Sequence, residues 1–138
     1  MAKTSLLNAA DKQLPALRYA VELQKTAATV GFDWPHIDGV IAKIHEELDE
    51  VAAELDDADP KKLQEEIGDL LFAITNLARH LDVDPEQAIE QCNQKFLRRF
   101  QFIETQIIQQ GKSLQTASLD ELDALWDKAK LSDKKNED

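Results

Sequence analysis

Hydrophobic residues recur at helical intervals along most of the chain, and turn-forming residues divide this pattern into about five segments. At about 100° per residue, apolar side chains three or four positions apart share one helix face. The expected helices run from about 15 to 30, 37 to 55, 60 to 81, 85 to 110 and 118 to 131. No stretch alternates apolar and polar residues as a half-buried strand does. The pattern predicts an all-α bundle.

Residues that start and stop helices lie at the borders of these segments. Aspartate followed by proline at the first helical position is a strong start signal, and serine three residues before glutamate forms a capping box. Glycine ends helices because it adopts a left-handed backbone without strain. The starts are Asp59-Pro60, Asp84-Pro85 and Ser118 with Glu121, and the stops are Gly31 and Gly111.

The 138 residues are enough for one compact domain with a real core and too few for two ordinary ones. We therefore expect one domain over residues 1–138, with short flexible ends at about 1–10 and 132–138. The segment 60–81 is apolar around most of its circumference, which predicts the most buried helix of the set.

Four acidic residues stand out against this helical framework. Glu47 and Glu50 lie along one flank of the apolar stripe of the second helix, and Glu66 and Asp69 share a face of the third. If these carboxylates lie about 5 Å apart, each like-charged pair costs about 3 kcal/mol at an effective dielectric of about 20. Protonation, separation or a divalent cation must relieve that repulsion. Oxygen ligands favour Mg²⁺, with Mn²⁺ as a possible substitute.

Magnesium in proteins usually keeps water ligands and binds through a few carboxylates together with substrate phosphates. A nucleoside diphosphate or triphosphate is therefore a natural second component. Lys95 and Arg99 flank the stripe of the fourth helix and could meet phosphate oxygens. The alternatives are a solvated acidic flank, a salt bridge of this quartet with Lys95 or Arg99, and an ion pair within the helix between Lys43 and Glu47.

The overall charge narrows the function classes. The formal net charge is −11, which argues against general binding to nucleic acids or anionic membranes. A single cysteine, Cys92, falls on an apolar stripe, where a buried inert thiol is usual, and suits a reducing compartment. No apolar run has the length of a signal peptide or a membrane span, so a cytoplasmic protein is expected.

Two stretches match a known motif. Residues 45–50, HEELDE, and 63–72, LQEEIGDLLF, together resemble the E-E-x-x-E then E-x-x-D signature of the MazG family of nucleoside triphosphate pyrophosphohydrolases. The likeness extends from about residue 14 to 130 and is closest to the C-terminal domain of the two-domain bacterial MazG proteins. It includes residues 14–17, 30–34, 76–80 and 95–100.

The resemblance implies a four-helix-type bundle completed by dimerisation, with a homodimer or a higher homo-oligomer as the assembly. It implies Mg²⁺-dependent cleavage of a nucleoside triphosphate to the monophosphate and pyrophosphate, in housecleaning of nucleotide pools. The metal ligands and catalytic residues carried over by position are Glu47, Glu50, Glu66 and Asp69. The implied nucleotide contacts are Lys43, Glu46, Lys95, Arg99, Trp126 and Lys130.

Two other functions remain open on the sequence. A narrower all-α dNTP or dUTP pyrophosphatase would share the same chemistry, and only its substrate range would differ. A helical dimerisation or regulatory module could carry the acidic cluster as a vestige or as a structural metal site.

Overall fold

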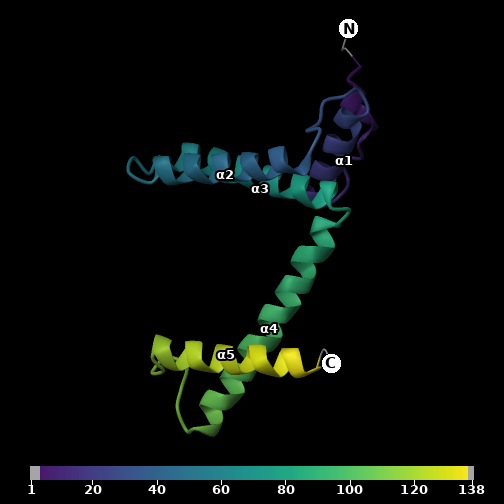
Figure 1. The fold of residues 1–138 in the computed structure, drawn as a ribbon. Coiled ribbons are helices and arrows are strands. Elements are labelled where there is room, and N and C mark those ends of the chain that lie inside the picture. The colour runs from purple at the N-terminus through teal and green to yellow at the C-terminus, as the bar shows by residue number, and fades with distance from the viewer. Residues whose placement is uncertain (1–3, 137–138) are drawn as a thin grey trace. The chain divides into compact units, whose positions relative to one another are not determined.

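The computed structural model describes residues 4–136 and, over that range, is built of helices. A short 3-10 helix, η1 (Leu6–Ala9), precedes α1 (Ala16–Ala28), α2 (Ile37–Glu54), α3 (Pro60–His80), α4 (Pro85–Gln109) and α5 (Leu119–Asn136) (Figure 1). The all-α prediction is confirmed. Within this range no helix has both the length and the apolar character needed to cross a membrane.

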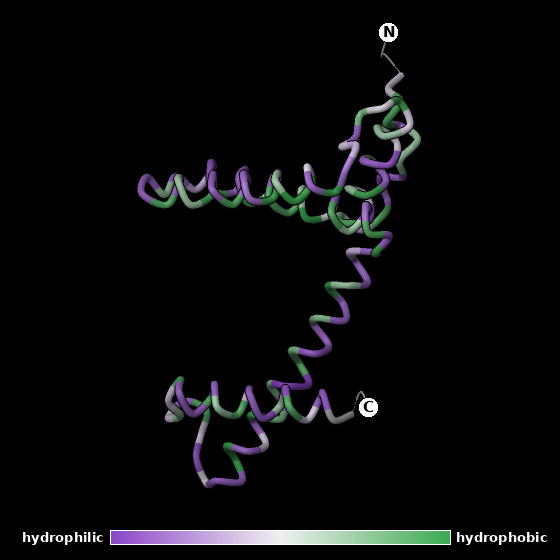
Figure 2. Tube along the Cα trace, in the orientation of Figure 1, coloured by the Kyte–Doolittle hydropathy of each residue, from purple (hydrophilic) through white to green (hydrophobic). Residues whose placement is uncertain are grey.

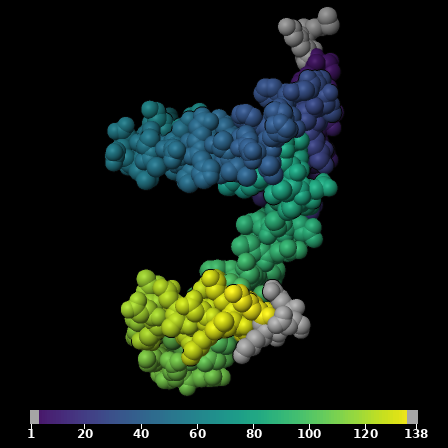
Figure 3. Space-filling model, viewed as in Figure 1, coloured from purple at the N-terminus to yellow at the C-terminus, as the bar shows by residue number. Residues whose placement is uncertain are grey.

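The chain divides into two compact units, Met1–Ala88 and Ile89–Asp138, so the fourth helix begins in the first unit and continues in the second. In the first unit α2 and α3 form a hairpin, and α1 packs against α3 (Figure 1). The atoms of α1, α2 and α3 form one continuous body in the space-filling view (Figure 3). Its buried side chains include Val40, Ala73 and Thr75.

The second unit is a smaller helix pair. Ile103 and Ile107 of α4 and Leu125 of α5 form its buried core, with Leu122 and Trp126 packed against them. The helix-starting serine behaves as the sequence indicates, because the Ser118 hydroxyl accepts a hydrogen bond from the Glu121 backbone N–H at 3.2 Å. The fifth helix continues past its expected end near Leu131 to Asn136.

The remaining start and stop signals also lie where the sequence places them. The Asp59 side chain accepts a hydrogen bond from the Lys61 backbone N–H at the start of α3. Asp84 accepts one from the Glu86 backbone N–H at 2.9 Å in the first turn of α4. Gly31 and Gly111 have φ values of 86° and 72°, the left-handed conformation that ends a helix.

Two expectations about burial are wrong. The third helix is not the most buried, since Ile67, Leu71 and Ile74 are 43%, 50% and 45% exposed. One side of α3 packs against α1 and α2, and the apolar residues on its other side are not covered by these two helices. Cys92 is also exposed, because α5 covers α4 around Ile103 and Ile107 rather than along the turns near residue 92. Apolar residues recur along those turns among hydrophilic ones (Figure 2).

A close contact between Gly39 and Trp34 joins the α1–α2 loop to the first turn of α2. A Cβ atom on Gly39 would lie 2.8 Å from Cε3 of Trp34, whereas a Cβ on Gly68 in α3 would meet nothing within 4 Å. We expect Gly39→Ala to lower the free energy of unfolding by about 1–2 kcal/mol through overpacking. Gly68→Ala is the matched control and should raise it by about 0.5–1 kcal/mol through helix propensity. Urea unfolding measures both, and equal stabilisation by the two variants would contradict the contact.

Candidate metal and nucleotide site

Three carboxylates meet where the α2–α3 hairpin brings its two helices side by side. Glu47 of α2 and Glu66 and Asp69 of α3 each offer an oxygen atom, and the three atoms all lie within 4.8 Å of one another. Glu66 and Asp69 converge because a spacing of three residues places them on one helix face. The fold therefore brings together three of the four acidic residues that helical spacing indicates.

Glu50 lies one turn beyond Glu47 and belongs to the same group. The neighbouring Glu66 carboxyl, within hydrogen-bonding reach, and the negative charge of Glu47 raise the pKa of Glu50 from its ordinary 4.5 to about 7. Two carboxylates that share a site cannot both ionise freely. The repulsion expected from the sequence is thus present and is relieved by protonation when no cation neutralises it.

The donor set fits a hard divalent cation. Oε2 of Glu47 and Oε2 of Glu66 are buried and have no hydrogen-bond partner within the described part of the chain. Buried polar atoms are nearly always partnered, so two orphan carboxylate oxygens in one cluster need an explanation. Oxygen ligands of this kind suit Mg²⁺ or Mn²⁺ better than Zn²⁺.

Lys43 binds the edge of this cluster. Its Nζ lies 3.0 Å from Oε1 of Glu47 and 3.5 Å from Oε1 of Glu46. The hydrogen bond to Glu47 raises the pKa of Lys43, so the lysine stays charged. The ion pair within the helix that the sequence allowed is therefore present. Glu46 is exposed and is not one of the three clustered carboxylates, although it shares the Lys43 ammonium with Glu47.

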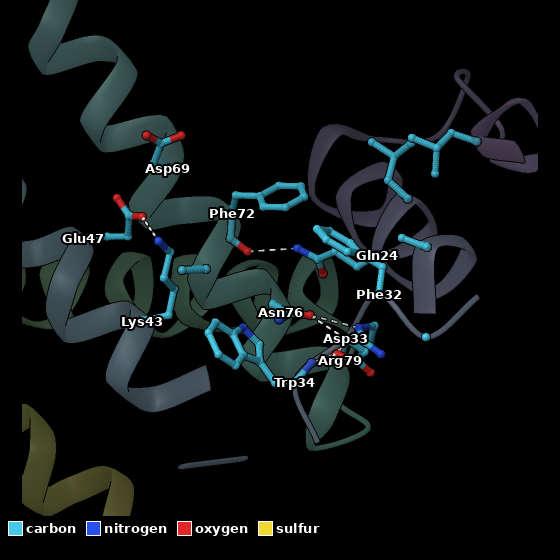
Figure 4. Close-up of a pocket in the computed structure, with 15 residues that line it drawn as sticks. Gln24, Phe32, Asp33, Trp34, Lys43, Glu47, Asp69, Phe72, Asn76 and Arg79 are labelled. Atoms are coloured by element: carbon cyan, nitrogen blue, oxygen red, sulfur yellow. Dashed lines mark hydrogen bonds and ion pairs between the residues drawn. The ribbon is translucent and has the colours of Figure 1, made fainter. Parts of the chain in front are cut away.

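A cavity of about 760 Å³ adjoins the carboxylates, and Glu47 and Asp69 line both the cluster and the cavity (Figure 4). Its other walls come from α1, the α1–α2 loop, α2 and α3, and they carry the aromatic side chains of Phe32, Trp34 and Phe72. A volume of this size accommodates a small organic ligand.

The helices that carry this site match a known protein family. Residues 37–101 match the family model for the MazG nucleotide pyrophosphohydrolase domain. The chain carries a MazG domain. The match begins with α2, runs through α3 and includes Glu46, Glu47, Glu50, Glu66 and Asp69.

Relatives of this MazG domain extend the likeness to nearly the whole chain. A Thermotoga maritima protein named nucleoside triphosphate pyrophosphohydrolase/pyrophosphatase MazG is 43% identical over 131 residues, which are 95% of this chain and 50% of the relative. The Escherichia coli K12 nucleoside triphosphate pyrophosphohydrolase is 42% identical over 131 residues, or 94% of this chain and 50% of the relative. The Bacillus subtilis protein YabN, described as uncharacterised, is 40% identical over 135 residues, 97% of this chain and 28% of its own length. The chain thus spans half the length of the two pyrophosphohydrolases.

Apart from Lys43, the basic residues that the family resemblance implies lie in the second unit of the chain. Arg99 of α4 donates a hydrogen bond from Nε to Oδ2 of Asp133 at 2.7 Å, and its guanidinium lies 5.3 Å from the ring centre of Trp126. Arg98 also pairs with Asp133, and the two arginines lower the pKa of that carboxyl. Lys95 and Lys130 are exposed. Their convergence with the acidic cluster stays a prediction, because the cluster belongs to the first unit and these residues belong to the second.

Sequence reasoning missed several residues of the cavity wall. Gln24 is buried, although its position between Val21 and Ala28 on the apolar stripe of α1 was a visible signal. The sequence analysis included Asn76 and Arg79 of α3 only as part of residues 76–80, one of the stretches that resemble the MazG family. Glu54, one turn beyond Glu50, also carries a buried oxygen without a partner in the described chain.

An ion-pair network fixes the α1–α2 loop at the rim of the cavity. Oδ1 of Asp33 accepts hydrogen bonds from Nη2 of Arg79 at 2.5 Å and from the Trp34 backbone N–H at 2.8 Å, and it lies 2.9 Å from Nε2 of His80. The Arg79 hydrogen bond lowers the pKa of Asp33 to about 2. This network holds Phe32 and Trp34 against the cavity.

Asp33→Asn should lower the free energy of unfolding by about 1.5–3 kcal/mol near neutral pH, because Arg79 loses its charged partner. A lowered pKa means that the stabilisation is complete above the ordinary pKa of 3.8 and is lost as the pH falls toward 2. Urea unfolding at pH 6 and at pH 3 measures both effects. A difference between wild type and variant that does not shrink at pH 3 would contradict the assignment. Asp38→Asn, an exposed change in the first turn of α2, is the control.

Proposed function

We propose that the chain is a Mg²⁺-dependent nucleoside triphosphate pyrophosphohydrolase, which converts a triphosphate and water to the monophosphate and pyrophosphate. The observation that carries the proposal is the approach of the Glu47, Glu66 and Asp69 oxygens within 4.8 Å beside a cavity large enough for a nucleoside. The Thermotoga maritima and Escherichia coli relatives, both named as nucleoside triphosphate pyrophosphohydrolases, support the reaction class.

In this proposal Glu47, Glu50, Glu66 and Asp69 hold the cation. When bound, Mg²⁺ would neutralise phosphate charge and polarise a coordinated water. Water oxygen would attack the α phosphorus while a carboxylate of the cluster accepts the proton that the water loses. The bond from that phosphorus to the bridging oxygen breaks, and pyrophosphate leaves with the bridging oxygen. The carboxylates would fix the position of the phosphate chain, and Lys43 orients the Glu47 carboxylate through its 3.0 Å contact.

The remaining nucleotide contacts in the proposal are cationic or aromatic, apart from Glu46. Lys95, Arg99 and Lys130 would stabilise the charge that accumulates on the phosphate chain. Arg99 would exchange Asp133 for a phosphate oxygen, since both are anionic acceptors of the same guanidinium. Trp126, which supports Arg99 by its ring face, would order that side chain.

We also propose a homodimer, or a higher homo-oligomer, as the active assembly. Ile67, Leu71 and Ile74 recur at helical spacing on α3 and are all more than two-fifths exposed. Exposed apolar residues grouped on one helix face favour burial against a partner. Light scattering after size-exclusion chromatography should give at least twice the 15.6 kDa of one chain. A monomer at micromolar concentration would refute this part.

The test of the function is incubation with a panel of NTPs and dNTPs plus Mg²⁺, with the products resolved. Pyrophosphate and a monophosphate are expected, and orthophosphate would overturn the assignment. Activity confined to dNTPs or dUTP would instead select the narrower pyrophosphatase. A non-enzymatic module would show no turnover and no binding of a nonhydrolysable nucleotide linked to Mg²⁺ in calorimetry.

A further inference from the structure

The cavity beside the carboxylates has two chemically different ends. Glu47, Asp69 and Lys43 supply charged groups at one end (Figure 4). The rest is mainly apolar and aromatic, and the polar groups in its wall are the amides of Gln24 and Asn76 and the ion pair between Asp33 and Arg79. A metal-bound phosphate chain would occupy only the charged end. The apolar end is suited to a different, less polar part of the ligand.

Gln24 holds a buried, unpartnered hydrogen-bond acceptor in the wall of this end. Gln24 is 8% exposed, and its Nε2 atom donates a hydrogen bond to the backbone carbonyl of Phe72 at 3.0 Å. Because a carbonyl only accepts, the nitrogen must face Phe72, and this fixes the amide orientation. The Oε1 atom is then left buried without a partner in the described chain. A buried amide oxygen in a cavity wall is a binding group that can accept from an N–H or O–H donor of a ligand.

Asn76 presents the opposite group. Its Oδ1 accepts hydrogen bonds from Nε and Nη2 of Arg79 at 3.0 Å and 2.8 Å. An arginine only donates, so the Asn76 oxygen must face it, and the Nδ2 amide remains as a donor. Arg79 is in turn held by Asp33, so the Asn76 amide cannot flip without breaking this network.

We propose that this cavity receives the nucleobase and that Gln24 and Asn76 bind its polar edge. Gln24 Oε1 would accept from a base N–H, and Asn76 Nδ2 would donate to a neighbouring ring nitrogen or carbonyl oxygen. Every nucleobase carries such a donor next to such an acceptor on its pairing edge. Phe32 or Trp34 would stack on the base face, which every base offers. The inference rests on the proposed function, because the adjoining carboxylates must hold the metal of the phosphate chain.

In this proposal Gln24 only binds the base and takes no part in the chemical step. Replacing it should therefore change KM and leave kcat nearly unaltered. Gln24→Met keeps the size of the side chain and removes both amide groups. The Phe72 carbonyl retains a side-chain donor in this variant, since the Thr75 hydroxyl also bonds to it at 2.9 Å. The exposed residue Gln87 in α4 supplies the matched control, Gln87→Met.

The experiment compares wild type, Gln24→Met and Gln87→Met with the best triphosphate from the substrate panel. We expect a KM about tenfold higher for Gln24→Met, with kcat within twofold, and no change for Gln87→Met. Calorimetry with the corresponding monophosphate and a metal chelator should show about tenfold weaker binding to Gln24→Met. Unaltered KM and monophosphate affinity in a folded Gln24→Met protein would overturn the inference and leave a water-filled cavity.

A second measurement uses only the wild-type protein, so it does not depend on folding of the variant. A monophosphate whose base N–H groups on the pairing edge are methylated should bind about tenfold more weakly than the parent compound. Equal affinity would overturn the inference. If wild type hydrolyses no triphosphate yet discriminates between these monophosphates, the proposed function fails and the base site stands. Hydrolysis without this discrimination would support the proposed function and refute the base site.

Discussion

Glu66→Gln is expected to reduce kcat/KM for triphosphate hydrolysis by about 100-fold or more at saturating Mg²⁺. The substitution keeps the shape of the side chain and removes one of the three charges whose oxygens lie within 4.8 Å. Replacing a residue that only orients a metal ligand typically lowers metal affinity or activity by about 10–100-fold. Replacing a ligand itself should therefore lower activity by at least about 100-fold. Steady-state kinetics over a Mg²⁺ titration measure the loss and show whether added cation restores it.

Glu65→Gln is the matched control for this variant, because Glu65 is the adjacent residue of α3 and is exposed. It changes the net charge by the same amount and should retain wild-type activity. Undiminished turnover of Glu66→Gln would remove Glu66 from the metal site. An equal loss in both variants would indicate a general charge effect in place of ligation.

Magnesium should stabilise the folded protein by about 10 °C in Tm at 100 times its Kd and pH 8. Binding to the folded state alone at that ratio contributes about 2.7 kcal/mol, and each kcal/mol moves the Tm of a domain of this size by a few degrees. The effect depends on pH because the pKa of Glu50 is raised to about 7 by its hydrogen-bonded neighbour Glu66 and by Glu47. Thermal unfolding with Mg²⁺ or with a chelator at pH 5.5 and pH 8 measures the shift.

The direction of the pH effect follows from proton binding. Between the ordinary pKa of 4.5 and the raised value of about 7, the folded protein holds a proton at Glu50 that the unfolded chain releases. The metal-free protein therefore loses stability as the pH rises through this window. Magnesium competes with that proton, so its stabilising shift should grow from pH 5.5 to pH 8. A shift of equal size at both pH values would contradict the shared site, and Glu50→Gln should flatten the pH dependence while Glu65→Gln preserves it.

Local chemistry explains how much of the fold could be predicted. Helix starts at Asp59, Asp84 and Ser118 depend on hydrogen bonds to backbone groups two or three residues away, so the sequence contains both partners. The grouping of Glu66 with Asp69 depends only on helix periodicity. The meeting of these two with Glu47 required the hairpin of α2 and α3, which the short connection of residues 55–59 makes the natural arrangement.

The cavity could not be predicted, because its polar groups depend on contacts between distant residues. Gln24 gains its orientation from Phe72, 48 positions away, and Asp33 meets Arg79 at a separation of 46. Helix periodicity places a residue on a face and says nothing about which carbonyl or carboxylate lies opposite it. The exposure of Cys92 and of the α3 residues was missed for a related reason: an apolar stripe indicates a face that prefers burial, whether or not the same chain supplies the cover.

The contact between Lys43 and Glu47 has a consequence for the entropy of cation capture. One oxygen of Glu47 is held by the ammonium group at 3.0 Å, and the other is buried without a partner among the described residues. A carboxylate that is already immobilised loses little rotamer freedom when a ligand arrives. Part of the entropy cost of ordering Glu47 is therefore already included in folding. Lys43→Met removes the group that holds this carboxylate, so it should weaken Mg²⁺ binding even though Lys43 is not itself a metal ligand.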